Sequence, residues 1–129
     1  MSQYDFSGKH IMCDITGVAE DVVLDNTRIL DSIALGITDS GATLCGVQLK
    51  EFEPIGLAAV YILSESHVSV HTYPELGALF FDVFTCGDHC VPERILDALL
   101  RALGPCEYRV SVVGRGDPVT SGTPARRST

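Results

Sequence analysis

The sequence predicts an α+β fold, in which one antiparallel sheet carries two helices on one face. Two segments place apolar residues at helical spacing, and residues typical of helix ends flank both of them. The other apolar segments are short, and they alternate or run continuously as strands do. Their order is one strand, one helix, four strands, one helix and one strand. This order is typical of a sheet with its helices packed on one side.

The two helices are expected between residues that start and stop helices. The first follows Asp25 or Asn26, either of which can cap the first turn, and it ends before Gly41. The second begins at Pro92, because proline suits the first helical turn, and it ends at Gly104. Isoleucines in the first segment and leucines in the second form one apolar stripe each, so both helices are expected to pack on the sheet.

The strands are expected at 9–18, 42–50, 57–63, 67–71, 76–84 and 108–113. Residues 57–63 and 76–84 are apolar on both faces, although the predicted helices cover only one face of the sheet. A second sheet is therefore expected to cover the other face. We predict that two copies pair sheet to sheet as an αββα sandwich, in a homodimer or a dimer of cleaved αβ units.

The 129 residues suit one domain, which we place at 1–114. From Arg115 onward the apolar pattern stops, and glycine, proline, serine, threonine and arginine dominate. Residues 115–129 are therefore expected to form a disordered tail.

The chain carries a formal net charge of −8, which argues against nucleic acid as a partner and favours a cationic small molecule. No segment approaches the roughly 20 apolar residues that span a bilayer, and the N-terminal stretch does not resemble a signal peptide, so no membrane partner is expected. The five cysteines are an odd number scattered among apolar neighbours, which suits reduced thiols. We expect a cytoplasmic protein.

Groups capable of chemistry are concentrated in one stretch, Ser64-Glu65-Ser66-His67-Val68-Ser69-Val70-His71-Thr72-Tyr73-Pro74-Glu75, and in Phe84-Thr85-Cys86-Gly87-Asp88. A serine hydroxyl can attack the carbonyl of the preceding residue and form an ester. Elimination of that ester, followed by hydrolysis, leaves a pyruvoyl group on the downstream chain. A Glu-Ser-His tripeptide alone is more typical of a turn between two strands.

The surrounding order of residues resembles that of the bacterial S-adenosylmethionine decarboxylase proenzymes, a pyruvoyl-dependent family. The resemblance covers about residues 8–114 and is carried by Phe-Glu-Pro-Ile-Gly at 52–56, Ser-His-Val-Ser-Val-His-Thr-Tyr-Pro-Glu at 66–75 and Asp-Val-Phe-Thr-Cys-Gly-Asp at 82–88. It implies self-cleavage between Glu65 and Ser66, giving a β chain of 1–65 and an α chain of 66–129.

The resemblance also implies a role for each matching residue. Ser66 becomes the pyruvoyl cofactor that forms a Schiff base with the substrate, His71 assists the cleavage, and Cys86 protonates the product carbanion. A thiol with an ordinary pKa of about 8.5 is a plausible acid for that step at neutral pH. No metal site is expected.

The implied substrate is S-adenosylmethionine, which would be decarboxylated to the aminopropyl donor of spermidine synthesis. In the resemblance Phe52 and Tyr73 offer aromatic faces to this substrate, and Glu75 lies near its amino-acid end. A sulfonium ion favours such stacking and cation–π contacts.

Three positions depart from the family pattern. Tyr73 stands where a tryptophan is common before Pro-Glu, and it is still aromatic. Ala58 stands where the family usually has a serine, so the hydroxyl that usually assists self-cleavage is missing, and Ser64 or Ser69 could replace it. Lys50 stands where the family often has a histidine, and a cation there would oppose a sulfonium substrate.

Three other interpretations remain open. A pyruvoyl-dependent arginine or ornithine decarboxylase of the same build would need a distant carboxylate, for which Glu51, Glu53 or Asp82 qualifies. An inactive regulatory partner of a true decarboxylase would explain Ala58. A zinc site at Cys86, His89 and Cys90 has three ligand types but no second cluster.

One geometric difficulty concerns Ser66 and His71. They are five residues apart, so a regular strand would direct them to opposite faces. A bulge or a corner is required if they act together.

Overall fold

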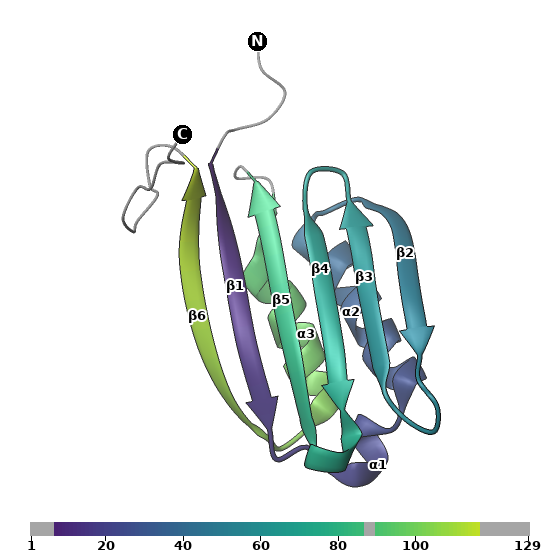
Figure 1. Cartoon of the computed structure of the whole chain (residues 1–129). Coiled ribbons are helices and arrows are strands. Elements are labelled where there is room, and N and C mark those ends of the chain that lie inside the picture. The colour runs from purple at the N-terminus through teal and green to yellow at the C-terminus, as the bar shows by residue number, and fades with distance from the viewer. Residues whose placement is uncertain (1–6, 87–89, 117–129) are drawn as a thin grey trace, which may run out of the picture.

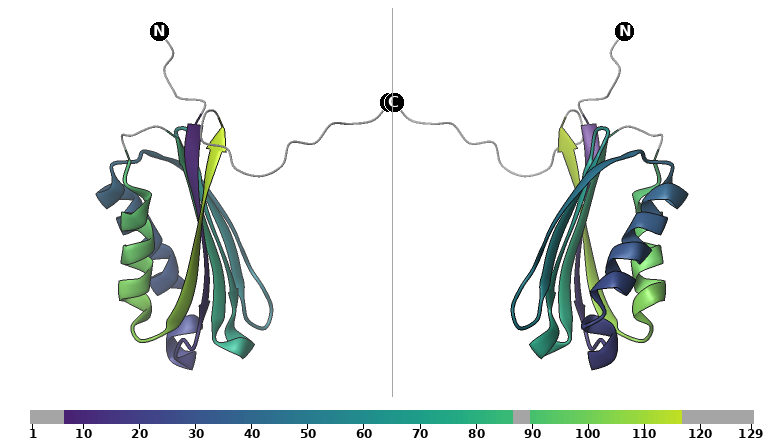
Figure 2. Two further views of the ribbon diagram at one scale, coloured as in Figure 1. Left: turned by 90° about the vertical axis from the view of Figure 1, so that its left-hand side faces the viewer. Right: turned by 90° about the vertical axis from the view of Figure 1, so that its right-hand side faces the viewer.

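The computed structural model describes residues 7–86 and 90–116. Its elements are β1 (Ser7–Thr16), α1 (Glu20–Val23), α2 (Asn26–Ser40), β2 (Leu44–Glu51), β3 (Leu57–Leu63), β4 (His67–Tyr73), the 3-10 helix η1 (Pro74–Leu76), β5 (Ala78–Cys86), α3 (Pro92–Leu103) and β6 (Glu107–Gly116). The strands form one sheet in the order β2-β3-β4-β5-β1-β6, and every neighbouring pair is antiparallel. Helices α2 and α3 lie on one face of this sheet, which confirms the predicted fold class (Figures 1 and 2).

The structure corrects predicted strand bounds; for example, β1 spans Ser7–Thr16 rather than 9–18, and β5 spans Ala78–Cys86 rather than 76–84. It contains the short helices α1 and η1, which have too few residues to show a helical period. Strand β6 includes Arg115 and Gly116, so it ends two residues beyond the predicted boundary at 114. The tail expected from there on falls at 117–129, outside the described residues.

Both long helices begin and end as their flanking residues predict. The side chain of Asp25 accepts a hydrogen bond from the Arg28 backbone N at 3.1 Å, which satisfies one free donor of the first turn of α2. Gly41 ends α2 with a φ of 91°, a left-handed conformation that favours glycine. Pro92 is the first residue of α3, and Gly104 follows its last.

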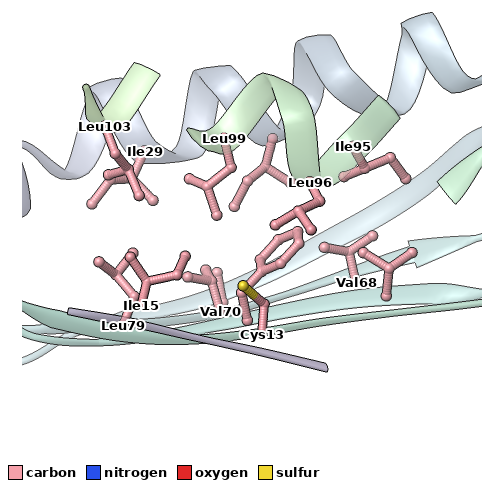
Figure 3. Packing of buried hydrophobic residues seen from close by; sticks show 14 of the residues in the cluster. Cys13, Ile15, Ile29, Val68, Val70, Leu79, Ile95, Leu96, Leu99 and Leu103 are labelled. Atoms are coloured by element: carbon pink, nitrogen blue, oxygen red, sulfur yellow. The ribbon is translucent and has the colours of Figure 1, made fainter. Parts of the chain in front are cut away.

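The hydrophobic core lies between the sheet and the two long helices. Figure 3 shows Leu99 of α3 and Ile29 of α2 directed toward the sheet, whose inner face presents Ile15 and Leu79. All four side chains are fully buried. The two helices approach each other closely at Gly36, because a Cβ atom built there would lie 2.9 Å from both the Ala98 Cβ and the Ile95 Cα.

The opposite face of the sheet, which points away from α2 and α3, is called the open face. Alternate strand residues on it remain exposed, among them Val60 at 38%, Ile62 at 49% and Phe80 at 53%. Residues 57–63 are therefore apolar on both faces, as predicted. Residues 76–84 are not, because Asp82 also points to the open face. Within the described residues, no helix has the length and apolar character needed to cross a bilayer.

Candidate active site

The candidate cleavage bond lies in the turn that joins β3 to β4. The Leu63 backbone N donates to the Ser66 carbonyl at 2.9 Å, which closes the turn around Ser64 and Glu65. The Ser64 backbone N donates to the Thr43 carbonyl at 3.1 Å and so holds the turn against the segment before β2. Ser66 therefore immediately precedes the sheet, in a turn that is fixed on both sides.

The candidate nucleophile and the candidate proton donor lie together at this end of the sheet. The Cys86 backbone N donates to the Ser66 Oγ at 3.3 Å, which positions the hydroxyl. Cys86 is the last residue of β5 and is partly buried. Cys13, in contrast, is buried in the core, and desolvation followed by the nearby Asp14 carboxylate raises the pKa of its thiol to about 11. A thiol held in its protonated form in the core suits packing rather than chemistry.

A second cluster occupies the other end of β4. The His71 ring stacks on Tyr73, with ring centres 4.7 Å apart, and on Phe52, with centres 5.9 Å apart. The interplanar angles are 8° and 13°, so the three rings are nearly parallel. Phe80 of β5 contacts Tyr73 edge-on at 5.1 Å. We call these four residues the aromatic ladder. Glu75 is exposed and lies in η1, which follows Tyr73 at the same end of the sheet.

Ser66 and His71 are far apart within one chain. The pairing of β4 with β5 is continuous from His67 to Tyr73, so no bulge or corner intervenes in this strand. Five residues at about 3.3 Å each separate the two residues by about 16 Å along the strand. In Figure 1 the β3–β4 turn lies at the upper edge of the sheet and η1 at the lower edge, at opposite ends of β4. The structure thus groups Ser66 with Cys86, and His71 with Phe52 and Tyr73.

A polar network on the open face adjoins the Ser66 end. Asp82 is its centre: one carboxylate oxygen lies 2.8 Å from the His10 Nε2 and 3.7 Å from the His67 Nε2, and the other accepts from the Ser69 hydroxyl. The Arg115 guanidinium lies 3.0 Å from the His10 Nδ1. His67, which directly follows Ser66 in the sequence, belongs to this network.

The contacts of His10 indicate which of its ring nitrogens accepts a hydrogen bond. A guanidinium can only donate, so the His10 Nδ1 must accept from Arg115. The imidazole proton then lies on Nε2 and is donated to Asp82. Three potential metal ligands, from His10, His67 and Asp82, do lie within 4.8 Å of one another. A metal on the His10 Nε2 would need that proton removed and Arg115 displaced, so this arrangement suits a hydrogen-bonded network better than a metal site.

Of the alternative zinc ligands, Cys90 has another partner, because its thiol contacts the Ser40 hydroxyl at 3.5 Å. His89 lies outside the described residues. Within the described part, the three-ligand groups include neither Cys86 nor Cys90.

Sequence reasoning did not identify the network of His10, Asp82 and Arg115. These residues come from three strands that are distant in sequence and adjacent in the sheet, as β5, β1 and β6. The available signal was a carboxylate and an imidazole at strand positions that alternate with buried apolar residues. Only the strand register places them side by side, and the sequence pattern does not reveal that register.

Comparisons with known proteins identify the family. A family model described as S-adenosylmethionine decarboxylase matches residues 9–116. The chain is 37% identical over 109 residues to the S-adenosylmethionine decarboxylase proenzyme of Methanococcus vannielii, covering 84% of this chain and 89% of that protein. It is 37% identical over 115 residues to the S-adenosylmethionine decarboxylase proenzyme 2 of Bacillus cereus, covering 88% and 93%.

The fold also matches a solved structure. The crystal structure of the adenosylmethionine decarboxylase from Aquifex aeolicus has a TM-score of 0.80 and 28% identity to this chain, over 93% of this chain and 99% of that one. On the family match and the extent of these likenesses, the chain belongs to the S-adenosylmethionine decarboxylase family.

Proposed function

We propose that this protein cleaves itself between Glu65 and Ser66 and then decarboxylates S-adenosylmethionine, supplying the aminopropyl donor for spermidine synthesis in the cytoplasm. The observation that carries the proposal is the position of Ser66. It follows Glu65 in a closed turn, and its hydroxyl is held 3.3 Å from the Cys86 backbone N. The residues present therefore fit a pyruvoyl group formed from Ser66.

The chain's own groups account for the steps at this turn. The Cys86 N–H donates to the Ser66 Oγ, so the hydroxyl proton remains available to a base while the oxygen attacks the Glu65 carbonyl. A pyruvoyl group at position 66 would supply a carbonyl that condenses with the substrate amine and accepts the electron pair released with carbon dioxide. The thiol belongs to the same residue that positions the hydroxyl, so Cys86 can return a proton to the substrate carbon.

The active site is completed by a second copy of the chain. Because His71 lies about 16 Å from Ser66 in one chain, it does not reach the hydroxyl of its own copy. The exposed apolar residues Val60, Ile62 and Phe80 favour pairing of two open faces. A two-fold axis would then bring the aromatic ladder of one copy to the cleavage turn of the other. The two sheets would form an αββα sandwich.

The aromatic ladder is the proposed site for the adenosyl part of the substrate. Phe52 is 39% exposed and already stacks on a ring of the ladder, so its outer face is available for a planar group. Glu75 would lie near the amino-acid end of the substrate. The carboxylates that a diamine-forming enzyme would need are partly engaged: Asp82 binds His10, and Glu51 accepts from Asn26 at 2.9 Å.

Intact mass measurement followed by substrate assays tests the proposal. We expect two fragments, 1–65 and 66–129, from the purified protein, and a single intact chain from Ser66→Ala. We expect the cleaved protein to release carbon dioxide from S-adenosylmethionine, and not from arginine or ornithine. A single intact chain in the wild type would support an inactive regulatory partner instead. Release from arginine or ornithine alone would overturn the substrate assignment.

A further inference from the structure

Lys50, Ala58 and His71 lie in one row across the open face. In the strand register Lys50 of β2 is opposite Ala58 of β3, and Ala58 is opposite His71 of β4. Residues opposite each other in a sheet direct their side chains to the same face. The lysine and the histidine are thus two strand spacings apart, about 10 Å, with only a methyl group between them.

A groove runs over this row. It has a volume of about 640 Å³, and Lys50, Ala58, Val60, Ser69 and His71 are among its lining residues. Because the side chain of Ala58 is only a methyl group, it does not fill the groove between the two basic side chains. The four-carbon stem of a lysine can therefore carry its ammonium over the alanine toward the imidazole.

The Lys50 ammonium has no hydrogen-bond or ion-pair partner among residues 7–86 and 90–116, unlike other cations of the sheet. Lys9 pairs with Glu93 at 2.8 Å, and Arg109 pairs with Asp14 at 3.1 Å. The two hydroxyls that were candidates to replace a serine at position 58 are a groove residue with another partner and a turn residue. Ser69 donates to Asp82, and Ser64 lies in the β3–β4 turn.

We propose that Lys50 is a processing residue: its ammonium, beside His71, stabilises the oxyanion of the self-cleavage reaction in place of a hydroxyl at position 58. The inference rests on the proposed function and on the sharing of sites between two copies. Lys50 and His71 of one copy then act on the turn of the other.

Groups of the chain alone can carry out the shift of the Glu65 acyl group from the Ser66 nitrogen to its oxygen. The Ser66 Oγ bonds to the Glu65 carbonyl carbon, its proton passes to His71, and the negative charge on the former carbonyl oxygen faces the ammonium. His71 then gives the proton to the Ser66 nitrogen as the C–N bond breaks, which leaves the ester and a free amine. Charge that develops in such a step is stabilised most by a fixed donor near the oxygen.

The test measures the rate of self-cleavage by intact mass during expression and after purification, without any substrate. Removal of one oxyanion donor typically slows a reaction about 10²- to 10³-fold, so we expect Lys50→Met to slow cleavage by roughly a hundredfold. Lys50→Arg should retain most of the rate, and Ala58→Ser should restore much of it in the Lys50→Met chain. Gln48→Met, which changes the same face of the same strand two residues away, is the matched control and should cleave normally.

The possible results distinguish a failure of the proposed function from a failure of the proposed role of Lys50. A wild-type chain that never cleaves contradicts the proposed function itself. A wild type that cleaves, with Lys50→Met cleaving equally fast, overturns the role of Lys50 alone. Equal slowing by Gln48→Met and Lys50→Met would also overturn it, because the effect would then reflect the stability of β2. Rescue by Ala58→Ser would support it, since a serine hydroxyl restores no charge to the strand.

Discussion

Two inactive variants should complement each other if cleavage occurs between copies. Ser66→Ala lacks the attacking hydroxyl, and His71→Ala lacks the base, so neither should cleave alone. In a mixed dimer the His71→Ala copy presents an intact Ser66 to the intact His71 of the Ser66→Ala copy. One site of the pair is then complete, and the other lacks both groups.

The expected extent of cleavage follows from the distance between the two residues in the sheet and from random pairing of the chains. The separation of about 16 Å along β4 is several times the reach of a hydrogen bond, so no side-chain rotation brings His71 to Ser66 of the same chain. Random pairing of equal amounts of the two variants places about half of the chains in mixed dimers. We therefore expect about half of the His71→Ala chains to be cleaved and the Ser66→Ala chains to stay intact.

The assay is coexpression of the two variants with tags of different mass, followed by denaturing mass spectrometry. Each variant expressed alone is the control. Absence of cleavage in the mixture, with mixed dimers demonstrated by copurification, would refute the shared site. Full cleavage of His71→Ala alone would refute the role of this histidine.

Three further outcomes are expected. Cys86→Ala should lower turnover by about 10²- to 10⁴-fold while much of the self-cleavage remains, because a general acid is lost, whereas Cys90→Ala should stay near wild type; the reverse pattern would identify the other thiol. Phe52→Ala should raise the KM for S-adenosylmethionine roughly ten- to a hundredfold with cleavage retained, if stacking contributes about 1–3 kcal/mol; an unchanged KM would place the adenine elsewhere. Gly36→Ala should lower the free energy of unfolding by about 1–3 kcal/mol in urea titrations, since its Cβ would meet the other helix at 2.9 Å, while Gly46→Ala, with no atom within 4 Å, should change it little.

The sequence predicted those parts of the fold that depend on local signals. The ends of α2 follow from Asp25 and Gly41, whose preferences act within one turn of the helix. Strand β3 was predicted with its observed bounds because its apolar run ends sharply at both ends. Helix α1 has only four residues, too few to show a helical repeat of apolar residues. Its position depends on contact with the rest of the fold, as the buried side chains of Val22 and Val23 indicate.

The sequence named candidate residues for the site but did not reveal their arrangement. The family pattern named Ser66, His71 and Cys86, and the odd spacing of the first two already indicated a difficulty within one strand. The turn before β4 and the register of β5 decide that Cys86 meets Ser66 and that His71 does not. Such distant pairings depend on strand order, which local patterns do not contain.

The strand order also decides what becomes of the protein once the bond before Ser66 is broken. Fragment 1–65 would hold β1, β2 and β3, and fragment 66–129 would hold β4, β5 and β6, yet β1 lies between β5 and β6. Strand β1 of the first fragment is thus inserted between two strands of the second. In addition, α2 of the first fragment packs on α3 of the second. Pulling the fragments apart would break three strand pairings at once. Cleavage therefore changes the molecularity of refolding, from a single chain that folds on its own to two fragments that must meet in solution.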